Sequence, residues 1–142
     1  MTYRFLPHTA DALVEIEAAT REALLHDAVA AVRELLVGQS AVAVAEARSI
    51  TLSGTDVADL TFELLRELLY RFATDRFIPT RLELDQLSLA RGGPAALAGT
   101  VFGEKFDPAR HETQPEVKAV TRHGLQVTET GDGFRAEILF DV

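Results

Sequence analysis

The sequence predicts an α+β domain in which a mostly antiparallel sheet packs with two helices. Two long segments carry apolar residues at every third or fourth position, which is typical of amphipathic helices. Several shorter segments alternate apolar and polar residues, which is typical of half-buried strands. The order along the chain is strands, helix, strand, helix and then a run of strands, and this order favours an α+β arrangement.

The first 18 residues predict two strands joined by a bend. Residues 3–6 form a short apolar start, and residues 14–18 alternate apolar side chains with Glu15 and Glu17. The intervening segment, residues 7–11, contains a proline and an aspartate, both of which favour turns. The bend therefore places His8 and Asp11 at the end of a strand.

Two helices are expected in the middle of the chain, each with a capping residue. Thr20 is a plausible N-cap for the first helix, which runs to Gly38, a residue suited to the position after a helix C-terminus. A strand around Ile50 follows and ends at residues 53–54. Thr55 or Asp56 caps the second helix, which extends to about residue 75 and whose apolar stripe is wide enough to be covered on more than one side.

The remaining residues predict two hairpins. Four leucines, at positions 82, 84, 87 and 89, are followed by the turn 91–94 and a returning strand at 96–102. Residues 125–127, the Gly-Asp-Gly turn at 131–133 and the alternating segment 134–140 form the second hairpin. The sheet is therefore expected to be largely antiparallel.

The composition bounds the class of protein. A chain of 142 residues with 47% hydrophobic and 25% charged residues fits one globular domain, residues 1–142. The net charge of -8 repels phosphate backbones, so direct binding of nucleic acid is not expected. Cysteine is absent, which excludes disulfides and thiolate nucleophiles. No segment approaches the about 20 apolar residues of a membrane span, and a cytoplasmic location is expected.

Common catalytic motifs are missing from the sequence. It contains no Walker loop, no dinucleotide-binding glycine pattern, no Gly-x-Ser-x-Gly elbow and no His-Glu-x-x-His helix. Three polar groupings remain. The first is His8 with Asp11, for which capping of the local turn by the carboxylate is the alternative explanation.

The second grouping lies in the stretch 103–123, where the Asp107-Pro108 step favours a turn and dense charge predicts exposure at the end of a sheet. Each charge alone is explained as a solvated surface group, whereas a cluster in a loop between strands suits a functional site. Its members are Glu104, Asp107, His111, Glu112, Lys118 and His123.

The third grouping is the chain end. Asp141 and the terminal carboxylate of Val142 place two anionic groups one residue apart, and Asp11 is the candidate for a third. Three such oxygen ligands would suit a hard divalent cation. The alternative is that the end of the chain is frayed and solvated.

Five segments, in order and spanning nearly the whole chain, resemble the archease family. They are residues 8–11 (HTAD), 67–70 (ELLY), 103–111 (GEKFDPARH), 116–123 (EVKAVTRH) and 140–142 (FDV). The paired Gly-Glu-x-x-Asp-x-x-x-His and Glu-Val-Lys-Ala-x-Thr-x-His patterns, together with the Asp-apolar ending, make the resemblance specific.

The resemblance implies an accessory protein, not an enzyme, for the RtcB-type RNA ligase that joins tRNA exons in tRNA splicing and repairs RNA ends. It implies that this protein promotes GTP-dependent guanylylation of the ligase and supports multiple turnover. By resemblance, Asp11, Asp141 and the Val142 carboxylate form a site for calcium, magnesium or manganese. The residues expected on the same functional face are His8, Glu104, Asp107, His111, Lys118 and His123.

Two other functions remain open at the level of sequence. One is a free-standing metal-dependent enzyme that acts on a small substrate through His8, Asp11, Asp107 and His111. The other is a chaperone-like interaction module with no chemistry of its own.

Overall fold

The computed structural model describes residues 2–6, 11–90 and 93–142, and of residues 123 and 124 it describes the backbone alone. Seven strands and two helices occur in this part of the chain. In chain order they are β1 (Thr2–Leu6), β2 (Asp11–Ala18), α1 (Arg21–Val37), β3 (Glu46–Gly54), α2 (Val57–Asp75), β4 (Phe77–Leu89), β5 (Ala95–Lys105), β6 (Ala119–Thr130) and β7 (Gly133–Asp141).

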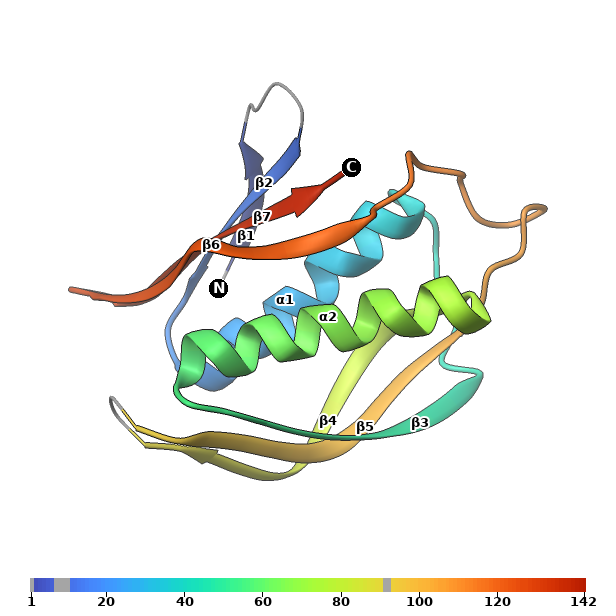
Figure 1. The fold of residues 1–142 in the computed structure, drawn as a ribbon. Helices are drawn as coiled ribbons and strands as arrows, with labels where there is room; N and C mark the ends of the chain where they lie inside the picture. Colours follow the sequence, from blue (N-terminus) through green and yellow to red (C-terminus); the bar gives the residue numbers. More distant parts are fainter. Residues whose placement is uncertain (1, 7–10, 91–92) are drawn as a thin grey trace.

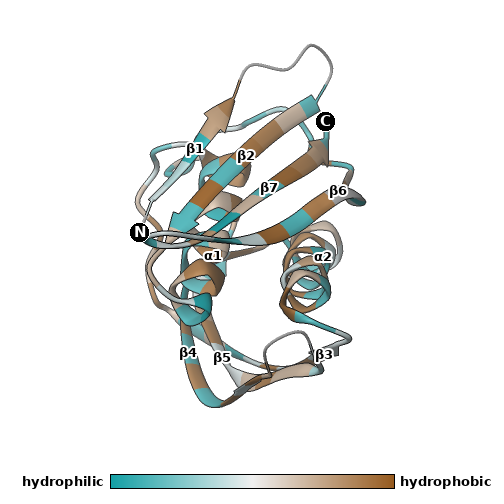
Figure 2. Cartoon of the chain, turned by 90° about the vertical axis from the view of Figure 1, so that its left-hand side faces the viewer, coloured by the Kyte–Doolittle hydropathy of each residue, from teal (hydrophilic) through white to brown (hydrophobic). Residues whose placement is uncertain are grey.

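The strands form two separate antiparallel sheets, with the helices between them (Figure 1). One sheet has the order β1-β2-β7-β6 and the other has the order β3-β5-β4. The view turned by 90° shows α1 and α2 side by side as a middle layer (Figure 2). The predicted α+β class is confirmed, while the expected single sheet is divided into two.

The helix layer explains why two sheets are needed. The wide apolar stripe of α2 is buried from Val57 to Leu69, and α1 buries nine residues. A helix that is apolar over so much of its surface cannot be covered by one sheet alone. Side chains from both helices and both sheets join one core cluster, which includes Leu24, Leu64, Phe77 and Phe140, all fully buried.

The predicted helix ends are confirmed. The Thr20 hydroxyl accepts a hydrogen bond from Ala23 N at 3.0 Å, and the Asp56 carboxylate accepts one from Asp59 N at 2.8 Å. Gly38 has φ 62°, and its N–H donates to Glu34 O at 2.8 Å. Both helices therefore begin at side chains that satisfy otherwise unpaired backbone N–H groups.

Removal of the Asp56 cap gives a direct test of this local assignment. Asp56→Ala leaves a backbone N–H of α2 without its acceptor, so the free energy of unfolding is expected to fall by about 1 kcal/mol. Urea unfolding measures the change. Asp56→Asn keeps an acceptor and should stay close to the wild type, whereas no loss in Asp56→Ala would show that the cap contributes nothing.

The strand predictions are confirmed in outline and refined in detail. The expected hairpins are the β4–β5 and β6–β7 pairs, although residues 91 and 92 of the first turn lie outside the described residues. Strand β6 begins at Ala119, so the end of the stretch 103–123, which was expected to be a loop between strands, is extended and paired. The segment between β5 and β6, drawn in orange, runs from one sheet to the other at one end of the molecule (Figure 1).

Glu15 on β2 departs from the simple alternation of buried and exposed residues. It is only 2% exposed because Arg4 and Arg135 cover it from the neighbouring strands. Hydrogen bonds from Arg135, and then from Arg4, lower the pKa of Glu15. On the outer surface of this sheet, the Glu15 carboxylate thus links β2 to both neighbouring strands through ion pairs with Arg4 and Arg135.

No helix in the described part of the chain has both the length and the apolar composition needed to cross a membrane.

Candidate functional site

The sheet register brings Asp11 and Asp141 together. Asp11 begins β2, Asp141 ends β7, and the two residues are direct antiparallel partners. Such partners point to the same face of a sheet, with Cβ atoms about 5 Å apart. The next pair, Ala12 and Phe140, faces the core, where Phe140 is fully buried. The two aspartates therefore lie on the outer face, away from the helices.

The last residue of the chain lies beside this pair. The Lys118 N–H donates to the Asp141 carbonyl oxygen at 2.8 Å, which attaches the end of β7 to the segment that precedes β6. Val142 follows Asp141 directly and is 38% exposed. Val142, whose carboxylate is the third ligand that the resemblance implies, therefore lies at the same strand end as Asp141, and Lys118 is an exposed neighbour of this end.

The donor set at this strand end suits a hard divalent cation. Calcium, magnesium and manganese prefer carboxylate and other oxygen ligands. Two carboxylates placed directly opposite each other also repel, and a cation would offset that repulsion. Within the described residues, no three His, Asp or Glu side chains gather where they could hold a metal. A site here would therefore combine two side chains with the main-chain carboxylate.

Glu104 and His111 form a second polar cluster, which is buried. Their exposed fractions are 6% and 3%, so the expectation of exposure is wrong for these two residues. Arg110 donates to both Glu104 carboxylate oxygens, at 2.5 and 3.1 Å, and Ala43 N–H donates to one of them at 2.8 Å. These bonds hold the pKa of Glu104 at about 2, with Arg110 as the largest cause. Full satisfaction of the carboxylate is what makes its burial tolerable.

The hydrogen bonds also assign the proton on His111. The Asp107 N–H donates to His111 Nδ1 at 2.9 Å, so this nitrogen is an acceptor. The proton must therefore be on Nε2, which lies 3.0 Å from Glu104 Oε2 and donates to it. Both ring nitrogens are occupied within the protein. His111 consequently fastens the segment after β5 and is poorly placed to act as a base or a metal ligand.

The other predicted residues of this stretch have different surroundings. Asp107 accepts hydrogen bonds from Ala109 N at 3.0 Å and from Arg110 Nε at 3.1 Å, which lower its pKa. It therefore stabilises the local turn that its Asp-Pro step predicts. His123 lies in β6, where only its backbone is described, and His8 lies outside the described residues.

Sequence reasoning missed a hollow next to the chain end. It has a volume of about 460 Å³, and its apolar lining comes from β1, β2, α1, the segment before β6 and the chain end. These apolar residues are Phe5, Ala12, Leu35, Pro115, Val117 and Val142. Glu34 also lines it, from the last turn of α1, where the helix dipole favours cations and no basic residue occurs. An acidic residue in the last turn of a helix is unfavourable for stability, so the sequence alone could have marked Glu34 as a candidate functional residue.

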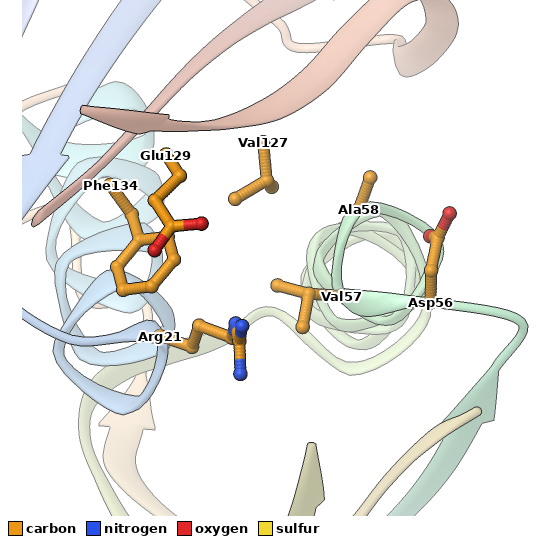
Figure 3. Close-up of a pocket in the computed structure, with 7 residues that line it drawn as sticks. All are labelled: Arg21, Asp56, Val57, Ala58, Val127, Glu129 and Phe134. Atoms are coloured by element: carbon orange, nitrogen blue, oxygen red, sulfur yellow. The ribbon is translucent and has the colours of Figure 1, made fainter. Parts of the chain in front are cut away.

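A smaller hollow lies at the other end of β7, beside the N-terminal ends of both helices (Figure 3). Its polar groups have structural partners. The Arg21 guanidinium stacks over the Phe134 ring at 5.0 Å and Asp56 caps α2. We therefore place the candidate site at the opposite end, around Asp11, Asp141 and Val142.

Comparisons with known proteins identify the family to which the chain belongs. The model of the Archease protein family (MTH1598/TM1083) matches residues 3–142. The chain is 32% identical to "Protein archease" of Methanopyrus kandleri over 142 residues, covering 100% of each chain. It is 30% identical to "Protein archease" of Methanosarcina barkeri over 140 residues, covering 99% of this chain and 95% of the relative.

Two solved structures share the fold. The solution structure of Methanobacterium thermoautotrophicum protein 1598 has a TM-score of 0.77 and 26% identity, covering 99% of this chain and 98% of that one. The crystal structure of a Thermotoga maritima archease, described as a possible chaperone, has a TM-score of 0.60 and 21% identity, covering 96% and 94% of the two chains. The family match over almost the whole length decides the assignment: the chain belongs to the Archease protein family.

Proposed function

We propose that this protein is a cytoplasmic accessory protein that activates an RtcB-type RNA ligase in tRNA splicing and RNA repair. In this proposal it promotes guanylylation of the ligase by GTP and supports repeated turnover, while the nucleophile belongs to the ligase. Membership of the family supports the general assignment. The observation that carries the proposal is the register that sets Asp11 opposite Asp141, one residue before Val142.

The chain's own residues would hold and present a divalent cation. Asp11, Asp141 and the Val142 carboxylate are the ligands in this proposal, and they lie at the rim of the sheet, where a partner can approach. When bound, such a cation offsets negative charge on a transferring phosphoryl group. Lys118, exposed beside the strand end, is placed to contact phosphate or an acidic group of the partner.

The net charge of -8 supports a protein partner with a basic surface. A ligase that holds RNA needs such a surface, and opposite charges raise the rate of encounter. The same charge disfavours independent binding of RNA by this chain.

The free-standing enzyme is less well supported, because both nitrogens of His111 are used inside the fold. An interaction module remains the second candidate, since a Thermotoga maritima relative is described as a possible chaperone. That function would need exposed apolar surface, and the hollow near Val142 provides some.

A guanylylation assay distinguishes these functions. The ligase of the source organism is mixed with GTP and a divalent cation, with and without this protein, and covalent GMP on the ligase is measured over time. We expect faster guanylylation and more than one ligation per ligase when the protein is present. No acceleration over the ligase alone, at any of several cations, would contradict the proposal.

A further inference from the structure

The hollow near the chain end exposes apolar surface that the fold itself does not cover. Phe5 and Val142, which line it from β1 and from the chain end, are 37% and 38% exposed. Both are among the few large apolar residues exposed in the described part of the chain. Apolar surface that lies in a concave site, rather than scattered singly, is typical of binding sites.

The polar part of the hollow is acidic, and no basic side chain lines it; the Arg33 guanidinium lies nearby but contacts Tyr3. Glu34 accepts hydrogen bonds from Tyr3 Oη at 2.8 Å and Gln39 Nε2 at 3.1 Å. Glu112 accepts one from Gln39 N at 3.2 Å. All three donors are neutral, and none of the ion pairs recorded within the described residues includes either glutamate. Two negative charges in this hollow are therefore available to a cationic partner.

The hollow adjoins the candidate site at Val142. Val142 contributes its side chain to the hollow and its terminal carboxylate to the proposed metal ligands. By strand alternation, Asp141 points to the outer face whereas Val142 points toward the helices. A partner that wraps around this strand end would contact both the outer carboxylates and the hollow.

We propose that the hollow binds a segment of the ligase in which one apolar side chain is flanked by lysine or arginine. The apolar side chain fills the space between Phe5 and Val142, and its basic neighbours pair with Glu34 and Glu112. Only the identity of the partner rests on the proposed function. A nucleic-acid strand fits this site poorly, because its phosphates would face two carboxylates.

The charge requirement is tested by the double variant Glu34→Gln/Glu112→Gln. Its affinity for the purified ligase, measured by calorimetry, is expected to fall about tenfold, since two complementary charges are removed. The matched control is Glu22→Gln/Glu83→Gln, which removes the same number of charges at exposed positions away from the hollow. The affinity of the control variant for the ligase should stay within about twofold of that of the wild type. Equal losses in both double variants would show a general field effect and overturn the inference.

The apolar requirement is tested by Phe5→Ala. Affinity for the ligase should fall several-fold, whereas Tyr70→Ala, which removes an aromatic residue that is 62% exposed on α2, should leave it unchanged. Asp11, Asp141 and Val142 are intact in all these variants. If the wild type accelerates guanylylation and the hollow variants bind normally, the inference fails and the proposed function stands.

If the wild-type protein does not bind the ligase, the proposed function fails. A peptide titration then still tests whether the hollow binds a basic segment with an apolar side chain. The probe is a capped Lys-Lys-Leu-Lys-Lys peptide, and its Glu-Glu-Leu-Glu-Glu counterpart is the control. Amide NMR signals of Leu35, Gly38 and Gln39 should move with the lysine peptide and stay still with the glutamate peptide. The inference would be overturned if the lysine peptide moved no amide signals, or if it moved signals over the whole acidic surface.

Discussion

Asp141→Asn is expected to abolish activation of the ligase while the domain remains folded. The variant removes one of two carboxylates that the register places directly opposite each other. If Asp141 is a metal ligand, as proposed, its loss should cost more than the roughly 10–100-fold typical of residues that only orient ligands. The backbone contact from Lys118 N–H to the Asp141 carbonyl oxygen does not depend on the side chain, so the strand pairing should persist.

Guanylylation rates and thermal unfolding, measured on the same preparation, check this expectation. The melting temperature should stay equal or rise, because a repulsion between like charges is removed. Calorimetry with calcium and with manganese, in the absence of the ligase, should show that metal affinity falls together with activation. A loss of activation with unchanged metal affinity would assign Asp141 to partner contact instead.

Glu137→Gln is the matched control for Asp141→Asn. Glu137 lies four residues earlier on β7, on the same outer face, and makes an ion pair with Arg135 at 2.8 Å. Its loss should leave activation within about twofold of the wild type. Deletion of Val142, which moves the terminal carboxylate onto Asp141, should resemble Asp141→Asn. Full activity in that deletion would show that the chain end is passive.

Local features of this fold could be predicted from the sequence because their causes are local. The caps at Thr20 and Asp56 and the stop at Gly38 depend on residues within one helical turn. The division into two sheets depends on which strands pair across the helices, and periodicity does not encode that choice. Strand alternation likewise predicted that Glu15 faces outward, but not that Arg4 and Arg135 would cover it.

The candidate site shows the same limit. Asp11 and Asp141 could be placed at strand ends, but their direct pairing is a matter of register between segments about 130 residues apart in sequence. Glu104 and His111 were expected on the surface because charged and polar residues usually are. Their burial depends on Arg110 and on the distant Ala43 N–H. A buried carboxylate of this kind is predictable only when its partners are known.

Glu104→Gln is expected to lower the free energy of unfolding at pH 7 by about 2 kcal/mol, since it weakens a buried, charge-assisted set of hydrogen bonds. Arg110 is half exposed, so in the variant its guanidinium can form hydrogen bonds with water, which limits the loss in the free energy of unfolding. The His111 Nε2–H would then face an amide in place of a carboxylate. Urea unfolding of the two proteins measures the difference, and Glu116→Gln, at an exposed position in the same segment, is the control.

The pH dependence of this difference tests its cause. The pKa of Glu104 is lowered from 4.5 to about 2 in the folded protein, so the unfolded chain takes up the proton first as the pH falls. The stabilisation is therefore complete above pH 4.5 and is lost progressively toward pH 2. The gap between wild type and Glu104→Gln should stay constant from pH 7 to about 5 and then narrow. A gap that does not change with pH would mean that packing, rather than the carboxylate charge, holds the segment after β5 in place.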